Sequence, residues 1–77
     1  PEKKIFEGEA DAVQLPGSDG LFQILKNHAP LISSLKEGKI KISQKENKNI
    51  MVSVKGGFVE VLKNKVTVLV EGATINN

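Results

Sequence analysis

The stretch "GGFVEVLKNKVTVLVEGA", residues 56–73, contains two segments in which valines recur at every second position. Val66, Val68 and Val70 share one side of the second segment, with the two-residue period of a half-buried β-strand. The short polar turn "KNK" separates the two segments, and Asn64 suits the left-handed backbone conformation that tight turns need. The stretch therefore predicts a β-hairpin.

The same period recurs upstream of this hairpin. The segments "KIKIS" (39–43) and "IMVSVK" (50–55) flank the polar hexad "QKENKN" and predict a second hairpin. Three further short strands are predicted, and they are "KKIFEG" (3–8), "ADAVQLPG" (10–17) and "GLFQIL" (20–25). Strand-like segments about every ten residues indicate an all-β sandwich or barrel.

Two segments fall outside this pattern. "APLISSLKEG" (29–38) is predicted to form a tight corner or a short strand pair, with one helical turn at most, because Ile32, Ser33 and Ser34 are weak helix formers. The tail "GATINN" (72–77) has few residues to bury and is expected to fray.

Length and composition describe a small protein with a thin aliphatic core. The 77 residues are predicted to form one domain, and a chain this short buries only about 60% of the surface that it exposes when unfolded. Cys, Trp and Tyr are absent, so neither a disulfide nor a thiolate metal site supports the core. No apolar run is long enough to span a bilayer, and no secretory signal is present. A soluble intracellular protein is the simplest interpretation. Because Pro1 is the first residue, we expect residues upstream to have been removed or left out.

The charge pattern argues against nucleic acid as a partner. All eleven basic residues are Lys, and nine acidic residues are interspersed among them to give a net charge of +2. Nucleic-acid sites usually use the guanidinium groups of Arg or aromatic side chains on which bases stack. With no Arg and three Phe, a mixed, solvated surface is the better interpretation.

The residues for catalysis are also missing from the sequence. His28 is the only histidine, and no Gly-x-Ser-x-Gly pattern accompanies Ser33 or Ser34. A metal site needs three or four ligands at a suitable spacing, and none appears. The run "PGSDG" (16–20) is interpreted as a turn in which Gly17 or Gly20 supplies a positive φ. We therefore expect no enzyme activity, cofactor, metal or small-molecule ligand, and we expect His28 to bond a neighbouring carbonyl group at a strand end.

An outer apolar face is a further expectation. Val59 and Val61 are predicted to lie opposite Phe58 and Leu62, and Thr67 and Leu69 are predicted to lie opposite the three valines of the second strand. Such a contiguous patch indicates an interface. It could equally be covered by a strand missing upstream or by the chain's own loops.

Three motifs together resemble a known family. "IFEGEADAVQLPGSDG", "HAPLISSLKEGKIKI" and "GGFVEVLKNKVTVLVEGA" stand in the order and spacing of the epsilon subunit of bacterial F-type ATP synthases. The resemblance implies a flattened sandwich of about ten short strands, with the first strand missing or truncated here. It also implies a non-catalytic central-stalk subunit, peripheral on the cytoplasmic side of the bacterial inner membrane, that binds the gamma subunit and the c-ring and couples ion-driven rotation to ATP synthesis.

The resemblance and the apolar face together give candidate contact residues. Those expected to face the c-ring are Asp19, Leu21, Lys26 and His28, and those expected to face gamma are Ser33, Ser34, Val59, Val61 and Leu69. The family commonly has an acidic residue where this chain has Leu21 and a Pro-Gly pair where it has Lys26-Asn27, so the charge contact with the ring is expected to shift to Asp19 or Lys26.

Other interpretations stay open at this point. Many family members continue into a C-terminal helical hairpin, which the residues up to Asn77 do not contain, so neither inhibition of rotation nor nucleotide binding is assigned. A lipoyl or biotinyl carrier domain would use a lysine at a hairpin tip, and Lys48 is the candidate. A small barrel that binds nucleic acid or oligosaccharide would need more aromatic side chains. A generic all-β interaction module is the remaining alternative.

Overall fold

The structure, a computed structural model, describes residues 2–75. Within this range the chain forms nine β-strands and one turn of 3₁₀ helix. The elements are β1 (Lys3–Gly8), β2 (Ala12–Gly17), β3 (Gly20–Leu25), β4 (Leu31–Leu35), β5 (Gly38–Gln44), η1 (Lys45–Asn47), β6 (Lys48–Val54), β7 (Gly56–Leu62), β8 (Lys65–Glu71) and β9 (Thr74–Ile75).

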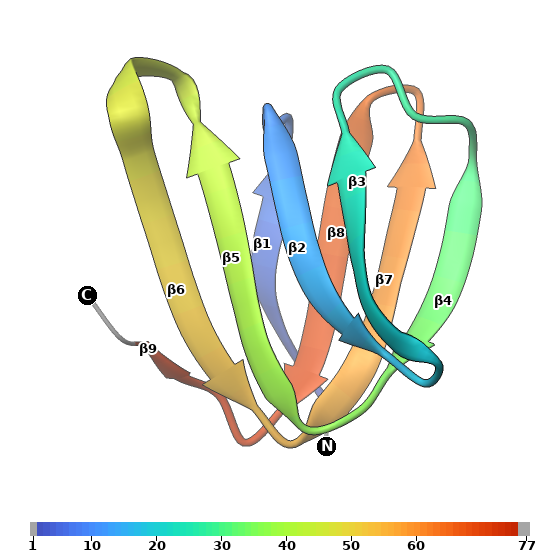
Figure 1. The fold of residues 1–77 in the computed structure, drawn as a ribbon, viewed down its shortest axis with the longest axis vertical. Coiled ribbons are helices and arrows are strands. Elements are labelled where there is room, and N and C mark those ends of the chain that lie inside the picture. The colour runs from blue at the N-terminus through green and yellow to red at the C-terminus, as the bar shows by residue number, and fades with distance from the viewer. Residues whose placement is uncertain (1, 76–77) are drawn as a thin grey trace.

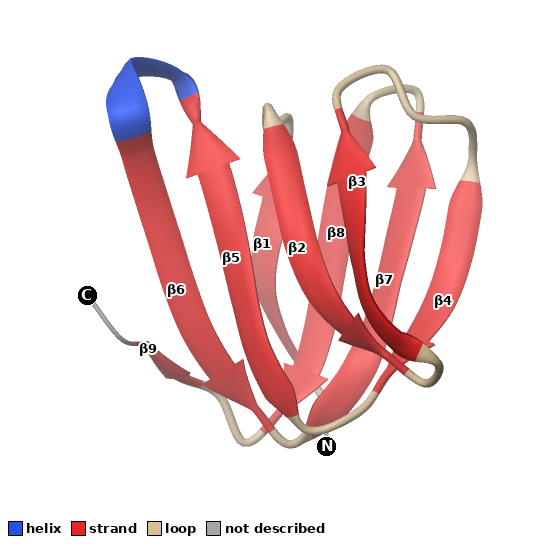
Figure 2. Ribbon diagram, in the orientation of Figure 1, coloured by secondary structure: helices blue, strands red, loops and turns tan. Residues whose placement is uncertain are grey.

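The strands form two layers of a flattened β-sandwich (Figure 1). One layer has the order β1-β8-β7-β4, and the other has the order β3-β2-β5-β6-β9. Every pairing is antiparallel, and the layers join where Gly17 of β2 pairs with Leu35 of β4. Figure 2 shows that strands make up nearly the whole fold and that its helical turn lies at the tip of the β5–β6 hairpin. The all-β sandwich predicted from the sequence is confirmed.

Both predicted hairpins are present. β5 and β6 pair from Gly38↔Val54 to Gln44↔Lys48, so the polar hexad contributes to the strands and only a three-residue turn remains. β7 and β8 pair from Gly56↔Glu71 to Leu62↔Lys65, which leaves a loop of Lys63 and Asn64. Both loop residues have positive φ, 51° and 65°, the backbone of a type I′ turn that matches the twist of the strands.

Two local predictions need correction. The segment predicted as a corner or strand pair contains one strand, β4, which pairs along its whole length with β7. The β-branched Ile32 fits a pleated surface better than a helix, and the neighbouring strand supplies the backbone partners. In the tail that was expected to fray, Thr74 and Ile75 pair with β6, while residues 76–77 lie outside the described range.

The core lies between the two layers, and its fully buried side chains are aliphatic, with Phe6 and Phe22 packed against them from partly buried positions. The buried side chains are Val13, Leu15, Ile24, Leu35, Ile40, Ile42, Val52, Val54, Val59, Val61, Val66, Val68 and Val70. They occupy alternate positions of their strands, as the two-residue period requires. No polar or charged side chain is buried within the described range. Packing of branched side chains therefore supplies the stability of the sandwich.

The outer apolar face predicted from β7 is wrong in one part. Val59 and Val61 are buried in the core, with exposed fractions of 0% and 2%, because they pair directly with Val68 and Val66. Cross-strand partners in an antiparallel pair project from the same face of the sheet. The side chains of β7 that project outward are those of the alternate residues, Phe58, Glu60 and Leu62.

The start of β7 depends on a glycine. Gly57 has φ of +153°, and a Cβ atom on it would overlap the carbonyl oxygen of Leu69 and lie 2.8 Å from the Cα atom of Val70. A backbone atom cannot move aside as a flexible side chain can. A Cβ atom on the neighbouring Gly56 would have more room, because the atom nearest to it would be the carbonyl oxygen of Leu35 at 3.5 Å.

We expect Gly57→Ala to lower the free energy of unfolding by at least about 2 kcal/mol, since it combines a disfavoured φ with a clash against backbone. Gly56→Ala is the matched control and is expected to change it by less than about 1 kcal/mol. Urea denaturation followed by circular dichroism measures both variants. Equal free energies of unfolding for the two variants would show that the backbone of β8 moves to make room for the added Cβ atom.

Candidate interaction surface

Exposed apolar side chains gather on the outside of the layer that contains β4, β7 and β8. Ile32 is 72% exposed, Leu62 is 52% exposed and Phe58 is 46% exposed, while Leu69 is partly buried. These four residues are called the apolar face below. They project outward because side chains alternate along a strand, and the alternate residues of the same strands project into the core.

The register shows how these side chains adjoin one another. Phe58 of β7 lies directly between Leu69 of β8 and Ser34 of β4, and Ile32 lies opposite Glu60. Ile32 and Leu62 also line the same open hollow. The apolar face is therefore contiguous across three strands, with Glu60 as the charge in its midst.

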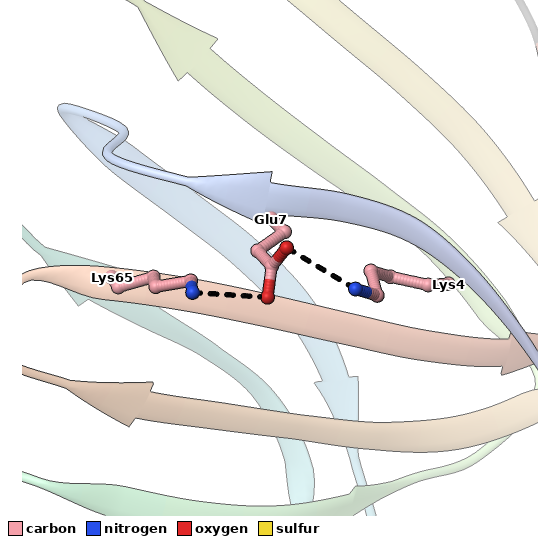
Figure 3. Close-up of polar contacts among 3 residues, drawn as sticks. All are labelled: Lys4, Glu7 and Lys65. Atoms are coloured by element: carbon pink, nitrogen blue, oxygen red, sulfur yellow. Dashed lines mark hydrogen bonds and ion pairs between the residues drawn. The ribbon is translucent and has the colours of Figure 1, made fainter.

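Charged side chains bound this face on the side of β1. The Nζ atoms of Lys4 and Lys65 each lie 3.1 Å from one carboxylate oxygen of Glu7, so Glu7 links β1 to β8 (Figure 3). The hydrogen bond from Lys65, followed by the hydrogen bond from Lys4 and the charges of both lysines, lowers the pKa of Glu7 from its ordinary value. The Glu7 side chain is 38% exposed, so water and salt weaken this link.

The pKa of Glu7 can be tested directly. We expect Lys65→Met to raise the pKa of Glu7 toward its ordinary value, because the largest favourable contact is lost, and Lys39→Met on the opposite layer to leave it unchanged. Carbon NMR of the Glu7 carboxyl group against pH measures the pKa. Because folding lowers this pKa, the stabilising contribution is present above the unfolded-state pKa and is lost as pH falls through the folded-state pKa. An unchanged pKa in Lys65→Met would contradict the ion pair.

A second feature lies at the β2–β3 turn. Asp19 and Leu21 line an open hollow of about 530 Å³ together with Ser33 and Ser34 of β4. The hydroxyl oxygen atoms of Ser18 and Ser34 lie 3.4 Å apart across it, and the Ser33 hydroxyl donates to the Ser34 carbonyl oxygen at 3.3 Å. Within the turn, Gly20 supplies the positive φ, of 124°, that the sequence predicted for Gly17 or Gly20.

His28 and Lys26 lie elsewhere. The β2–β3 turn is at the lower end of β3 in Figure 1, and the β3–β4 connection, residues 26–30, is at the upper end. Lys26 lies five positions beyond Leu21, which is about 17 Å at the usual rise per residue of a strand. The structure thus brings Asp19 and Leu21 together with the serines, and it does not bring them together with Lys26 and His28.

His28 occupies the structural role predicted for it. Its Nδ1 atom donates to the carbonyl oxygen of Ala29 at 2.7 Å, which confirms that the ring bonds a neighbouring carbonyl. It lines a narrow hollow with Val61 and Asn64, away from Ser33 and Ser34. The arrangement therefore contains no pair of His28 with either serine.

A further open hollow, of about 400 Å³, lies at the tip of the β5–β6 hairpin. It is lined by carboxylates and lysines in equal number, including Asp11 and Lys48. Among residues 2–75, no three His, Asp or Glu side chains gather as metal ligands would. The described part of the chain also contains no helix of the length and hydropathy needed to cross a membrane.

A small β-sandwich with a contiguous apolar outer face is typical of one class, that of protein-binding modules. The comparison with known proteins then gives the family. The family model described as "ATP synthase, Delta/Epsilon chain, beta-sandwich domain" matches residues 1–76. The chain belongs to this family of ATP synthase subunits.

Individual relatives agree with this family. The ATP synthase epsilon chain of Chlorobium limicola is 46% identical over 71 residues, which are 92% of this chain and 81% of the relative. That of Leptospira borgpetersenii is 49% identical over 72 residues, which are 92% of this chain and 55% of the relative. A chain in the cryo-EM structure of the Euglena gracilis mitochondrial ATP synthase, comprising OSCP, F1 and the c-ring, has a TM-score of 0.76 at 19% identity. That match covers 86% of this chain and 42% of that chain, and it shows the shared fold.

The family settles the broad function. Epsilon chains are central-stalk subunits of the F1 part of ATP synthase, which is peripheral to the membrane, and they are not its catalytic subunits. The carrier alternative built on Lys48 is not favoured, because the family match extends over nearly the whole chain.

Proposed function

We propose that residues 1–77 form one sandwich domain that binds the gamma subunit through the apolar face and the c-ring through the β2–β3 turn. In this role the domain lies on the cytoplasmic side of the bacterial inner membrane and passes ion-driven rotation of the ring to the catalytic head. The observation that carries the proposal is the exposure of Ile32, Phe58 and Leu62 on one contiguous face.

Burial of these side chains favours association. Apolar surface removed from water contributes about 25 cal/mol per Å² before the costs of association are subtracted. The face consists of aromatic and aliphatic residues around the single charge of Glu60, and further charged residues lie at its margin, near Glu7. A charged margin is usual for a protein interface. Ser34 pairs with Phe58 and shares its side of the sheet, whereas Ser33 pairs with the buried Val59 and lies on the other side. The proposed gamma contacts are therefore Ser34 and Leu69 from the sequence, with Ile32, Phe58 and Leu62 added.

The fold also suits a part that transmits torque. The two layers enclose a core without buried polar side chains among the described residues, and close-packed interiors have low compressibility. A force applied at the β2–β3 turn is therefore carried through β2, which pairs with β3, β5 and β4. The second layer receives it through β4 and β7.

The ring contact divides into two parts. Asp19 and Leu21 remain the proposed contacts at the β2–β3 turn. Lys26 and His28 lie at the far end of β3, so a loop that meets the turn does not reach them, and a separate segment of a partner would have to do so.

The proposal is tested by placing a charge on the apolar face. We expect Ile32→Asp to weaken binding to the purified gamma subunit at least about tenfold, because a carboxylate must be desolvated in an apolar contact. Leu25→Asp is the matched control, since Leu25 is also a largely exposed aliphatic side chain, at 57%, on β3 in the other layer. Calorimetric titration measures both, with circular dichroism as the check on folding.

The two variants separate the outcomes. Tight binding by a folded Ile32→Asp chain would contradict the apolar face as the gamma contact. An equal loss of affinity for gamma in Leu25→Asp would also contradict it. The loss would then come from the added negative charge and would not depend on the face that carries it. Val59→Asp cannot serve as the test, since it would place a carboxylate in the core.

A further inference from the structure

We infer that the gamma subunit presents one cationic side chain, of lysine or arginine, to Glu60 of β7, and that this pair decides which partner the apolar face accepts. The inference deepens the gamma contact proposed above and rests on it for the identity of the partner. Glu60 lies opposite Ile32 of β4 and opposite Thr67 of β8. Its neighbours along the outer side of β7 are Phe58 and Leu62.

No cation of the described chain offsets the charge of Glu60. Within residues 2–75 the ion pairs are those of Glu7 with Lys4 and with Lys65, and Glu60 takes no part in them. Glu7 and Glu60 both pair with Thr67, from its two sides, so the two carboxylates share the outer face and lie one strand apart. One of them is offset within the chain, and the other is left for a partner.

Association through the apolar face would cover the Glu60 carboxylate. Moving an ionised carboxylate from water into an apolar contact costs free energy unless a partner group compensates its charge. An incoming ammonium or guanidinium group compensates it with a charge-assisted hydrogen bond. A surface without such a cation leaves the carboxylate unpaired, and so does the same face of a second copy, which carries the same charge. Glu60 therefore selects among apolar partners.

The surroundings of Glu60 indicate the side from which the cation approaches. Glu60 lines two open hollows, one on each side of β7. The hollow on the β8 side, of about 300 Å³, is also lined by Lys63 and Lys65, so an incoming cation would meet like charges there. In the hollow on the β4 side, of about 370 Å³, Glu60 is the one charged group among the described lining residues, and Ile32 and Leu62 form part of the wall. The methylene groups of a lysine or arginine pack on such a wall while the head group reaches the carboxylate. The cation is therefore expected to approach over β4.

The test is calorimetric titration of the chain with purified gamma subunit at low and at high NaCl. We expect Glu60→Gln to weaken binding at low salt at least about tenfold, because it leaves the cation of gamma unpaired. The affinity of the parent chain is expected to fall with added salt more than that of Glu60→Gln. Glu60→Asp retains the charge and is expected to bind more tightly than Glu60→Gln. Glu46→Gln, at the tip of the β5–β6 hairpin, removes the same charge elsewhere and is expected to bind as the parent does.

Two results would overturn the inference alone. Binding by Glu60→Gln that equals or exceeds that of the parent would show that the carboxylate meets no cation in the complex. An equal loss in Glu46→Gln would show that net charge, and not the position of Glu60, governs the affinity. The variant Ile32→Asp separates these outcomes from the proposed function. If Ile32→Asp binds weakly while Glu60→Gln binds as the parent does, only the cation is removed from the account. Undiminished binding by Ile32→Asp, or no binding of gamma by the parent chain, would contradict the apolar face and this inference together.

Discussion

The contact on which the whole structure depends is the packing of the valines of β7 and β8 against the opposite layer. Val59 pairs with Val68 and Val61 with Val66, so the hairpin presents one apolar side to Leu15, Ile40 and Ile42. The two-residue loop at Lys63 and Asn64 fixes this register, because a slip of one residue would turn every valine to the outside. A chain of 77 residues has little other material with which to build a core.

The proposed contact surface follows from the same alternation. Once the valines of β7 face inward, Phe58 and Leu62 must face outward, and β4 adds Ile32 to them through its pairing with β7. An amphipathic strand normally places polar residues on its outer side. Here that side is partly apolar, and this exposed apolar surface is the contact that we propose for another subunit. The short β2–β3 turn then places Asp19 beside the margin of this surface.

Sequence patterns predicted most of the fold and less of the surface. Strand positions, both hairpins and the left-handed Asn64 follow from periodicity and turn chemistry. The side of the sheet from which Val59 and Val61 project was not predicted correctly. Periodicity shows which residues of one strand share a side, but it does not give the register in which two strands pair. The signal was present, since a two-residue loop makes Leu62 pair with Lys65, and counting back then pairs Val59 with Val68. The separation of Asp19 and His28 also follows from the sequence, because the strand predicted over residues 20–25 lies between them and the rise per residue places them at its two ends.

Hydrogen exchange tests the central claim, that the outer side of β4, β7 and β8 is the surface that contacts the central stalk. Exchange of backbone amides is measured by mass spectrometry for the chain alone and for the chain bound to purified gamma subunit. The account predicts that binding slows exchange in β4 and in the β7–β8 hairpin, residues 31–35 and 56–71, and leaves β5 and β6 unchanged. Protection confined to β5 and β6, with none on β4, would contradict it.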